Sequence, residues 1–253
     1  MGSHGVKMSK FFVNAGNIGD GAISITGEDV NHIKNVLRLK TGDKLLLCDG
    51  RGTDYEVVVE EFAHGLIRTS IVASYAGTTE PPIEVTLFQG IPKLDKMDYI
   101  VQKCVELGVG KIVPVINDRT VVRMDAGADV LKKVSRWRKI AAEAAKQCNR
   151  GIIPGVEQPQ GFKEALRLAG DAEIGIILYE NEKENGIRNC ISGREIKKIA
   201  LFIGPEGGYS ENEIKNAVSS GMKTVKLGPR ILRTETAGIA AISILMYEKG
   251  DAG

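Results

Sequence analysis

Residues 201–214, LFIGPEGGYSENEI, hold an apolar run, a glycine-rich turn and a helix start in immediate succession. Gly204 precedes a proline, which favours extended backbone and ends a strand. Gly207 and Gly208 permit positive φ and a close approach of other groups to the backbone. Ser210 and Glu213 have the spacing of a capping box, so a helix is expected to begin there. The stretch therefore predicts a strand, a loop and a helix, and open α/β sheets bind ligands at such strand ends.

The sequence on both sides of this stretch predicts the same architecture. Apolar runs at 85–88, 112–116, 174–179, 199–203 and 224–227 alternate with helical patterns, which indicates an α/β fold with a parallel sheet. Before them, residues 11–75 are rich in strand patterns with one helix expected at 27–39, typical of a small β-barrel-like module.

Gly, Thr and paired prolines in AGTTEPPIE, residues 76–84, mark the domain boundary. We therefore expect domains at residues 8–76 and 84–253. The opening MGSHGVKM resembles an expression-tag remnant, so natural numbering is expected to begin at Met8.

The composition is that of an ordinary globular protein and excludes several classes. Hydrophobic residues make up 43% and charged residues 26% of 253 positions, which excludes a disordered chain. The longest apolar run near the C-terminus is too short to cross a bilayer, so we expect a cytoplasmic protein with no membrane partner. Four widely spaced cysteines without a CxxC predict neither a metal site nor a disulfide framework. The net charge of +2 means that a nucleic acid would have to be bound by local basic patches.

The segment ADVLKKVSRWRKIAAEAAKQCNR, residues 128–150, is the clearest helical pattern. Its expected buried face consists of Val130, Val134, Trp137, Ala141, Ala144 and Cys148. The opposite face carries Lys132, Arg136, Lys139, Glu143, Lys146 and Arg150. This stripe is either an ordinary solvated surface or a row of cations that contacts a phosphate backbone.

The glycine-rich loop raises the question of its ligand, because Glu206 stands at its centre. A carboxylate about 4 Å from a phosphate charge costs roughly 4 kcal/mol at an effective dielectric near 20, and the loop has no GxGxxG or GK[ST] pattern. A cationic nucleoside such as S-adenosylmethionine (SAM) suits the loop better than a pyrophosphate. A purely structural turn remains the alternative.

A second stretch, LGPRILRTETAGIAAISIL at residues 227–245, also follows a predicted strand. It breaks at Gly228 and Pro229 and then presents Arg230, Arg233 and Glu235 before a helix rich in small residues. A tightly packed helix entry explains this pattern as well, but two such loops on neighbouring strand ends favour one shared pocket.

IGPEGG at 203–208 and LGPRILRTETA at 227–237 resemble the signature motifs of the RsmE family, the 16S rRNA uridine-N3 methyltransferases of the SPOUT superfamily. HIKNVLRLKTGDKLLLCDGRG, KMDYIVQKCVELGVGKIVPV with the later RT, and RWRKIAAEAAKQCNR are also similar to that family. The resemblance implies an N-terminal PUA-like RNA-binding domain and a C-terminal parallel sheet with a trefoil knot. It also implies a homodimer that uses SAM and no metal to methylate N3 of a uridine in the 16S rRNA of the small ribosomal subunit.

The resemblance assigns the cofactor residues by motif, whereas the catalytic and RNA candidates follow from the chemistry of the reaction and from the positions of cations. The implied cofactor pocket consists of Leu178, Tyr179, Glu180, Ile203, Gly204, Pro205, Glu206, Gly207, Gly208, Leu227, Gly228, Ile231, Leu232 and Ala237. Candidate catalytic residues are Arg233, Arg230 and Arg150 for stabilising charge on uracil, and Glu235, Glu143 or water for removing the proton. Expected RNA contacts are Lys10, Arg38, Lys40, Arg51, Arg136, Lys139 and Lys146. Lys10 departs from the family, in which an arginine is expected.

Two other functions remain open from the sequence. A dinucleotide-dependent oxidoreductase also uses a strand, loop and helix pocket, but the fingerprint GxGxxG is missing. A ribosome-assembly factor that binds RNA without catalysis is the second alternative, and the intact GPEGG and RILRTETA motifs argue against it.

Overall fold

The structure is a computed structural model that describes residues 10–121 and 127–252, so the expected natural start at Met8 lies outside the described residues. The chain forms two compact units. The first contains the chain up to Glu80 together with Ala145–Ile153, and the second contains Pro81–Ala144 and the chain from Pro154 onward. The contiguous division expected from the sequence does not include this return of residues 145–153 to the first unit.

The first unit is built on a five-stranded mixed sheet with the order β1-β3-β4-β5-β2. Its elements are β1 (Lys10–Phe12), η1 (Ala15–Asn17), β2 (Ala22–Thr26), α1 (Glu28–Asn31), η2 (His32–Val36), β3 (Lys44–Cys48), β4 (Thr53–Ala63) and β5 (Leu66–Ala76). Alternate residues such as Leu45, Leu47, Val57 and Val59 are buried in one core, as period-two patterning requires. The helix expected at 27–39 is a short α-helix followed by a π-helical turn.

The second unit contains a seven-stranded sheet with the order β12-β10-β11-β6-β7-β8, while β9 also pairs with β7. The strands are β6 (Glu84–Gly90), β7 (Lys111–Ile116), β8 (Gly155–Val156), β9 (Gln160–Gly161), β10 (Ile174–Leu178), β11 (Lys198–Ile203) and β12 (Lys223–Val225). All of these pairings are parallel, so the predicted α/β fold is confirmed. The last strand lies beside β10 rather than β11, which is consistent with the implied knot; the knot itself stays a prediction.

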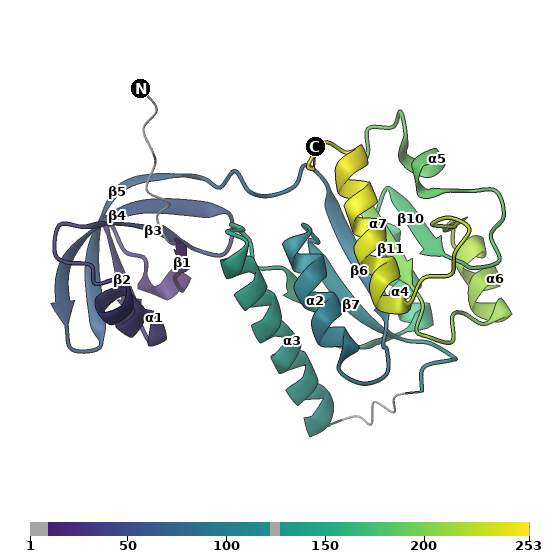
Figure 1. The fold of residues 1–253 in the computed structure, drawn as a ribbon, viewed down its shortest axis with the longest axis horizontal. Helices are drawn as coiled ribbons and strands as arrows, with labels where there is room; N and C mark the ends of the chain where they lie inside the picture. The colour runs from purple at the N-terminus through teal and green to yellow at the C-terminus, as the bar shows by residue number, and fades with distance from the viewer. Residues whose placement is uncertain (1–9, 122–126, 253) are drawn as a thin grey trace. The chain divides into compact units, whose positions relative to one another are not determined.

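Helices cover both faces of this sheet (Figure 1). They are α2 (Lys96–Glu106), α3 (Ala128–Gln147), α4 (Phe162–Leu168), η3 (Ala169–Asp171), α5 (Ile187–Ile191), α6 (Glu211–Ser219) and α7 (Thr234–Glu248). α7 packs against α2 and α5, whereas α4 and α6 bury Phe162, Ala165 and Ala217 against Phe88 and Phe202 of the sheet. Burial on both faces explains why the central strand β11 is apolar from Ile199 to Ile203.

The long helix α3 follows its predicted pattern with one correction. Val134, Trp137, Ala141 and Ala144 are buried, while the expected Val130 and Cys148 are half-buried. Arg150 does not project to solvent with the other charges. It lies beyond the helix end, is 4% exposed, and its guanidinium pairs with Glu80 at 2.6 Å.

The described residues contain neither a candidate membrane span nor a cluster of metal ligands. None of their helices has both the length and the apolar character needed to cross a membrane. Their His, Cys, Asp and Glu side chains do not gather into a group that could hold a metal ion.

Candidate active site

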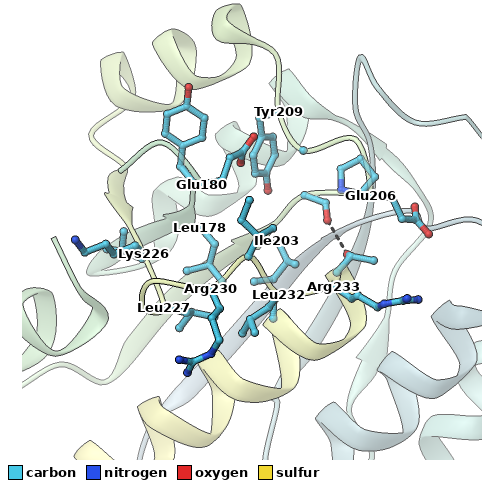
Figure 2. Close-up of a pocket in the computed structure, with 18 of the residues that line it drawn as sticks. Leu178, Glu180, Ile203, Glu206, Tyr209, Lys226, Leu227, Arg230, Leu232 and Arg233 are labelled. Carbon is cyan, nitrogen blue, oxygen red and sulfur yellow. Dashed lines mark hydrogen bonds between the residues drawn. The ribbon is translucent and has the colours of Figure 1, made fainter. Parts of the chain in front are cut away.

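A cavity of about 580 Å³ lies at the carboxyl ends of β10, β11 and β12, beside the first turn of α7. All fourteen residues expected to bind the cofactor line it, together with Arg230 and Arg233. Figure 2 shows Leu178, Ile203, Leu227 and Leu232 converging at its centre, with Glu180 and Tyr209 on one side and Glu206 and Arg233 on another. The structure thus brings the two motif loops into one pocket.

The backbone of the first loop, residues 204–210, is held by the predicted local signals. Ser210 caps α6 by accepting from the amide of Glu213 at 3.2 Å, and the Glu213 carboxylate accepts from the amide of Ser210 at 2.8 Å. The capping box is therefore confirmed. Gly208 has φ +65°, and a Cβ there would lie 2.9 Å from an oxygen of Glu180. The positive φ is the reason that this position favours glycine, since the Glu180 carboxylate ends a flexible side chain.

A buried network ties this loop to α7. The Thr234 hydroxyl donates to the carbonyl of Gly204 at 2.6 Å and accepts from the side-chain amide of Gln89 at 2.9 Å. Gln89 also donates to the carbonyl of Gly90 at 3.0 Å and is fully buried. Strand β6, the motif loop and the last helix are thus joined by groups that must be hydrogen-bonded because they are shielded from water.

The carboxylate of Glu206 is not the free negative charge that the sequence had led us to expect. Its carboxylate accepts from the ammonium of Lys96 at 3.0 Å and from the amide of Lys93 at 3.2 Å. Partial burial of Glu206 acts to raise its pKa. The hydrogen bonds from Lys96, from its own backbone amide and from Lys93 together outweigh that effect, so the pKa of Glu206 lies below its ordinary value. Because Lys96 compensates this charge, Glu206 does not by itself exclude an anionic ligand.

Several residues that hold the loop were given no role from the sequence. Arg119 donates to the carbonyl of Gly207 at 2.8 Å, and the side chain of Asn117 and the amide of Asp118 donate to the Glu213 carboxylate. All three follow β7, at the same end of the sheet as the loop. Their position after a parallel strand was a usable signal; their partners, about 90 positions away, were not.

Tyr179 and Glu180, which follow β10, also line the cavity, and the chain after them is held by Glu182. Glu182 accepts from the Thr224 hydroxyl at 2.6 Å and from the amides of Glu184 and Asn185. The hydrogen bond from Thr224, followed by those from the amides, lowers the pKa of Glu182 to about 2. Burial, and then the charges of Glu213 and Glu180, raise the pKa of Tyr209 well above its ordinary value, so this phenol stays neutral.

The candidate catalytic residues separate into two groups. Arg233 is the N-cap residue of α7, is exposed, and forms no ion pair within the part of the chain that the structure describes. Glu235 lies in the first turn of α7 and pairs with Lys96 at 3.3 Å. Unlike Arg233, the residues Glu235, Glu143 and Arg150 do not line the cavity. Arg150 is corrected as a catalytic candidate, because it is buried and paired with Glu80.

The comparisons with known proteins agree with this site. The RNA methyltransferase domain family matches residues 79–246, and the RNA methyltransferase PUA domain family matches residues 25–64. A relative from Bacillus subtilis named Ribosomal RNA small subunit methyltransferase E is 34% identical over 230 residues, which cover 89% of this chain and 90% of that protein. The chain belongs to the ribosomal RNA small subunit methyltransferase E family.

Two solved structures that are described as methyltransferases are also similar to this chain. A family member from Neisseria gonorrhoeae, described as bound to SAM, has a TM-score of 0.78 and 32% identity, covering 95% of this chain and 97% of that chain. A structure from Legionella pneumophila, described as a methyltransferase in complex with SAM, has a TM-score of 0.82 and 30% identity, with 96% and 98% covered.

The residues predicted to contact RNA differ in their exposure and in their ion pairs. Arg38, Lys40, Arg51 and Lys139 are exposed. The prediction that Lys10 contacts RNA is corrected, because this residue is only 7% exposed and its ammonium pairs with Asp54 at 2.7 Å. Carboxylates also engage two of the others: Lys146 pairs with Asp29, and Arg136 pairs with Asp98.

Proposed function

We propose that this protein transfers a methyl group from SAM to N3 of a uridine in the 16S rRNA of the small ribosomal subunit. The observation that carries the proposal is the single cavity lined by both motif loops. Membership of the family and the SAM-bound structures of similar chains support the same activity.

The residues of the cavity fit SAM. The volume of about 580 Å³ lies within the usual range for small-molecule sites. Apolar side chains such as Leu178, Ile203 and Leu232 can contact an adenine ring, while the glycine-rich loops present peptide groups to it. Glu180 adds an exposed carboxylate at one wall, which suits a ligand with positive charge. When bound, SAM supplies an electrophilic methyl group on a sulfonium, so the chain needs no redox or metal chemistry for this transfer.

The chain must orient the uracil and stabilise negative charge that develops on its carbonyl oxygens when N3 loses its proton. Arg233 is the best candidate for this role, because it lines the cavity, is exposed and forms no ion pair within the described residues. An arginine remains protonated and cannot serve as the base. The Glu235 carboxylate is paired with Lys96 and does not line the cavity, so we propose that the proton passes to water.

We further propose that RNA is bound through Arg38, Lys40 and Arg51 of the first unit and Lys139 of α3, all of which are exposed. The family resemblance adds two proposals, that the protein acts as a homodimer and that it works in the cytoplasm. Binding through phosphate contacts releases counterions. Affinity for small-subunit rRNA should therefore fall steeply as the salt concentration rises, and a flat response between low and moderate salt would contradict this mode of binding.

The direct test is transfer of a tritiated methyl group from SAM to small ribosomal subunits that lack the modification, followed by nucleoside analysis. The proposal expects 3-methyluridine as the labelled product. RNA binding without transfer would indicate an assembly factor, and a label on another nucleoside would refute the assignment to N3. Binding of NADH with no affinity for SAM would instead favour an oxidoreductase.

A further inference from the structure

Two carboxylates from different parts of the chain meet one ammonium beside the cavity. Lys96, in the first turn of α2, lies 3.0 Å from an oxygen of Glu206 and 3.3 Å from an oxygen of Glu235. Glu206 belongs to the first motif loop and Glu235 to the first turn of α7. Lys96 itself lines the cavity.

Through these two ion pairs, Lys96 joins the first motif loop to the start of α7. The loop is held at Gly204 by Thr234 and at Gly207 by Arg119. Between these two anchors, Glu206 is held by the amide of Lys93 and by the ammonium of Lys96. On α7 its second partner, Glu235, stands two residues after Arg233, and Figure 2 shows Glu206 and Arg233 extending on the same side of the pocket. One side chain thus connects the loop that forms the cofactor wall to the helix start that carries the catalytic candidate.

The charges make the connection strong only while Lys96 is present. Glu206 and Glu235 share this ammonium, and both are partly shielded from water, with side chains 28% and 18% exposed. Without the ammonium, two like charges would face each other and the two carboxylates would move apart. That movement would displace the loop, the helix start, or both.

We propose that Lys96 is a positioning residue for methyl transfer: its ammonium binds Glu206 and Glu235 together and so sets the cofactor loop and Arg233 in register. The inference rests on the proposed function, since it assigns Lys96 to that same site. Lys96 acts through its two partners and is not itself a catalytic residue.

The test compares Lys96→Met with Lys96→Arg in the full-length protein. SAM affinity is measured by calorimetry without RNA, and kcat and KM are measured with unmodified small subunits. Lys96→Met should weaken SAM binding at least fivefold and lower kcat at least tenfold, whereas Lys96→Arg should keep at least a third of the activity. Arg167→Met is a matched control, because it removes a cation from a 2.6 Å ion pair with Glu164 on α4, and it should leave both values unchanged.

A charge rescue separates this role from simple packing. Lys96→Met combined with Glu206→Gln removes the repulsion and should recover part of the SAM affinity lost in Lys96→Met. The acid limb of the binding profile against pH should also move to higher pH in Lys96→Met, because Glu206 loses the ammonium whose hydrogen bond lowers its pKa. A packing role moves neither readout.

Three results would overturn the inference: Lys96→Met within twofold of the wild type, equal losses in Lys96→Met and Lys96→Arg, or no rescue by Glu206→Gln. If Lys96→Met does not fold, Lys96→Arg and the double variant decide the question in the same assays. A wild-type chain that binds SAM but transfers no methyl group to rRNA would refute the proposed function, and the binding measurements would still test Lys96.

Discussion

Gly90 provides the sharpest test of how the site is built. It is the buried last residue of β6, and the loop residue Pro205 packs directly on it. A Cβ at position 90 would lie 2.5 Å from Cδ and 2.6 Å from the nitrogen of Pro205, and 2.8 Å from Oδ1 of Asn117. These atoms belong to a proline ring and to a side chain held by Glu213, so the neighbours cannot simply rotate away.

Gly90→Ala should therefore displace the motif loop. Overpacking of a well-packed site costs about 1–3 kcal/mol, and the rigid neighbours place this variant near 3 kcal/mol. For a protein of this size such a loss lowers Tm by roughly 6–12 °C. Because Pro205 lines the cavity, SAM affinity should also fall by about tenfold or more, which calorimetry can measure beside a thermal melt.

Gly175→Ala in β10 is the matched control. Its Cβ would lie even closer to a neighbour, 2.2 Å from Sδ and 2.9 Å from Cε of Met222. These atoms end a flexible side chain that can move, and alanine restricts the unfolded chain. The free energy of unfolding should change by less than about 1 kcal/mol. Equal effects of the two substitutions on Tm and SAM affinity would refute the reasoning.

Three further predictions follow from the site. Thr234→Val keeps the shape of the side chain but leaves the carbonyl of Gly204 and the amide of Gln89 without this partner, so unfolding by denaturant should show a loss of about 2 kcal/mol; an unchanged midpoint would contradict it. Arg233→Ala should lower the methylation rate more than tenfold while calorimetry finds SAM affinity nearly unaltered, and an unchanged rate would remove Arg233 from the mechanism. The pKa of Glu182, about 2 against an ordinary 4.5, means that its stabilisation is complete above pH 4.5 and disappears as the pH falls toward 2. The Tm of Glu182→Gln should consequently fall less than the Tm of the wild type as the pH is lowered from 4.5 toward 2. An equal dependence of Tm on pH in the two proteins would count against the assignment.

Local patterns in the sequence identified the elements of the site. The strand run before Gly204, the glycines at 207 and 208 and the capping box of Ser210 with Glu213 all appear where they were expected. The buried stripe of α3 was also visible, because a helical period places apolar residues on one face. These features depend on neighbours within a few positions, which the sequence displays directly.

Tertiary structure decided which charged groups are free. Lys10, Arg150 and Glu206 look like available charges in the sequence, yet each is paired with a residue 44, 70 or 110 positions away. No local spacing encodes such a pair, because the partners meet only after separate strands and helices pack. For the same reason, the anchors Gln89, Lys96 and Arg119 could not be identified from the motifs alone. The sequence by itself determined the loops of the pocket, and the packing of distant elements determined what holds those loops in place.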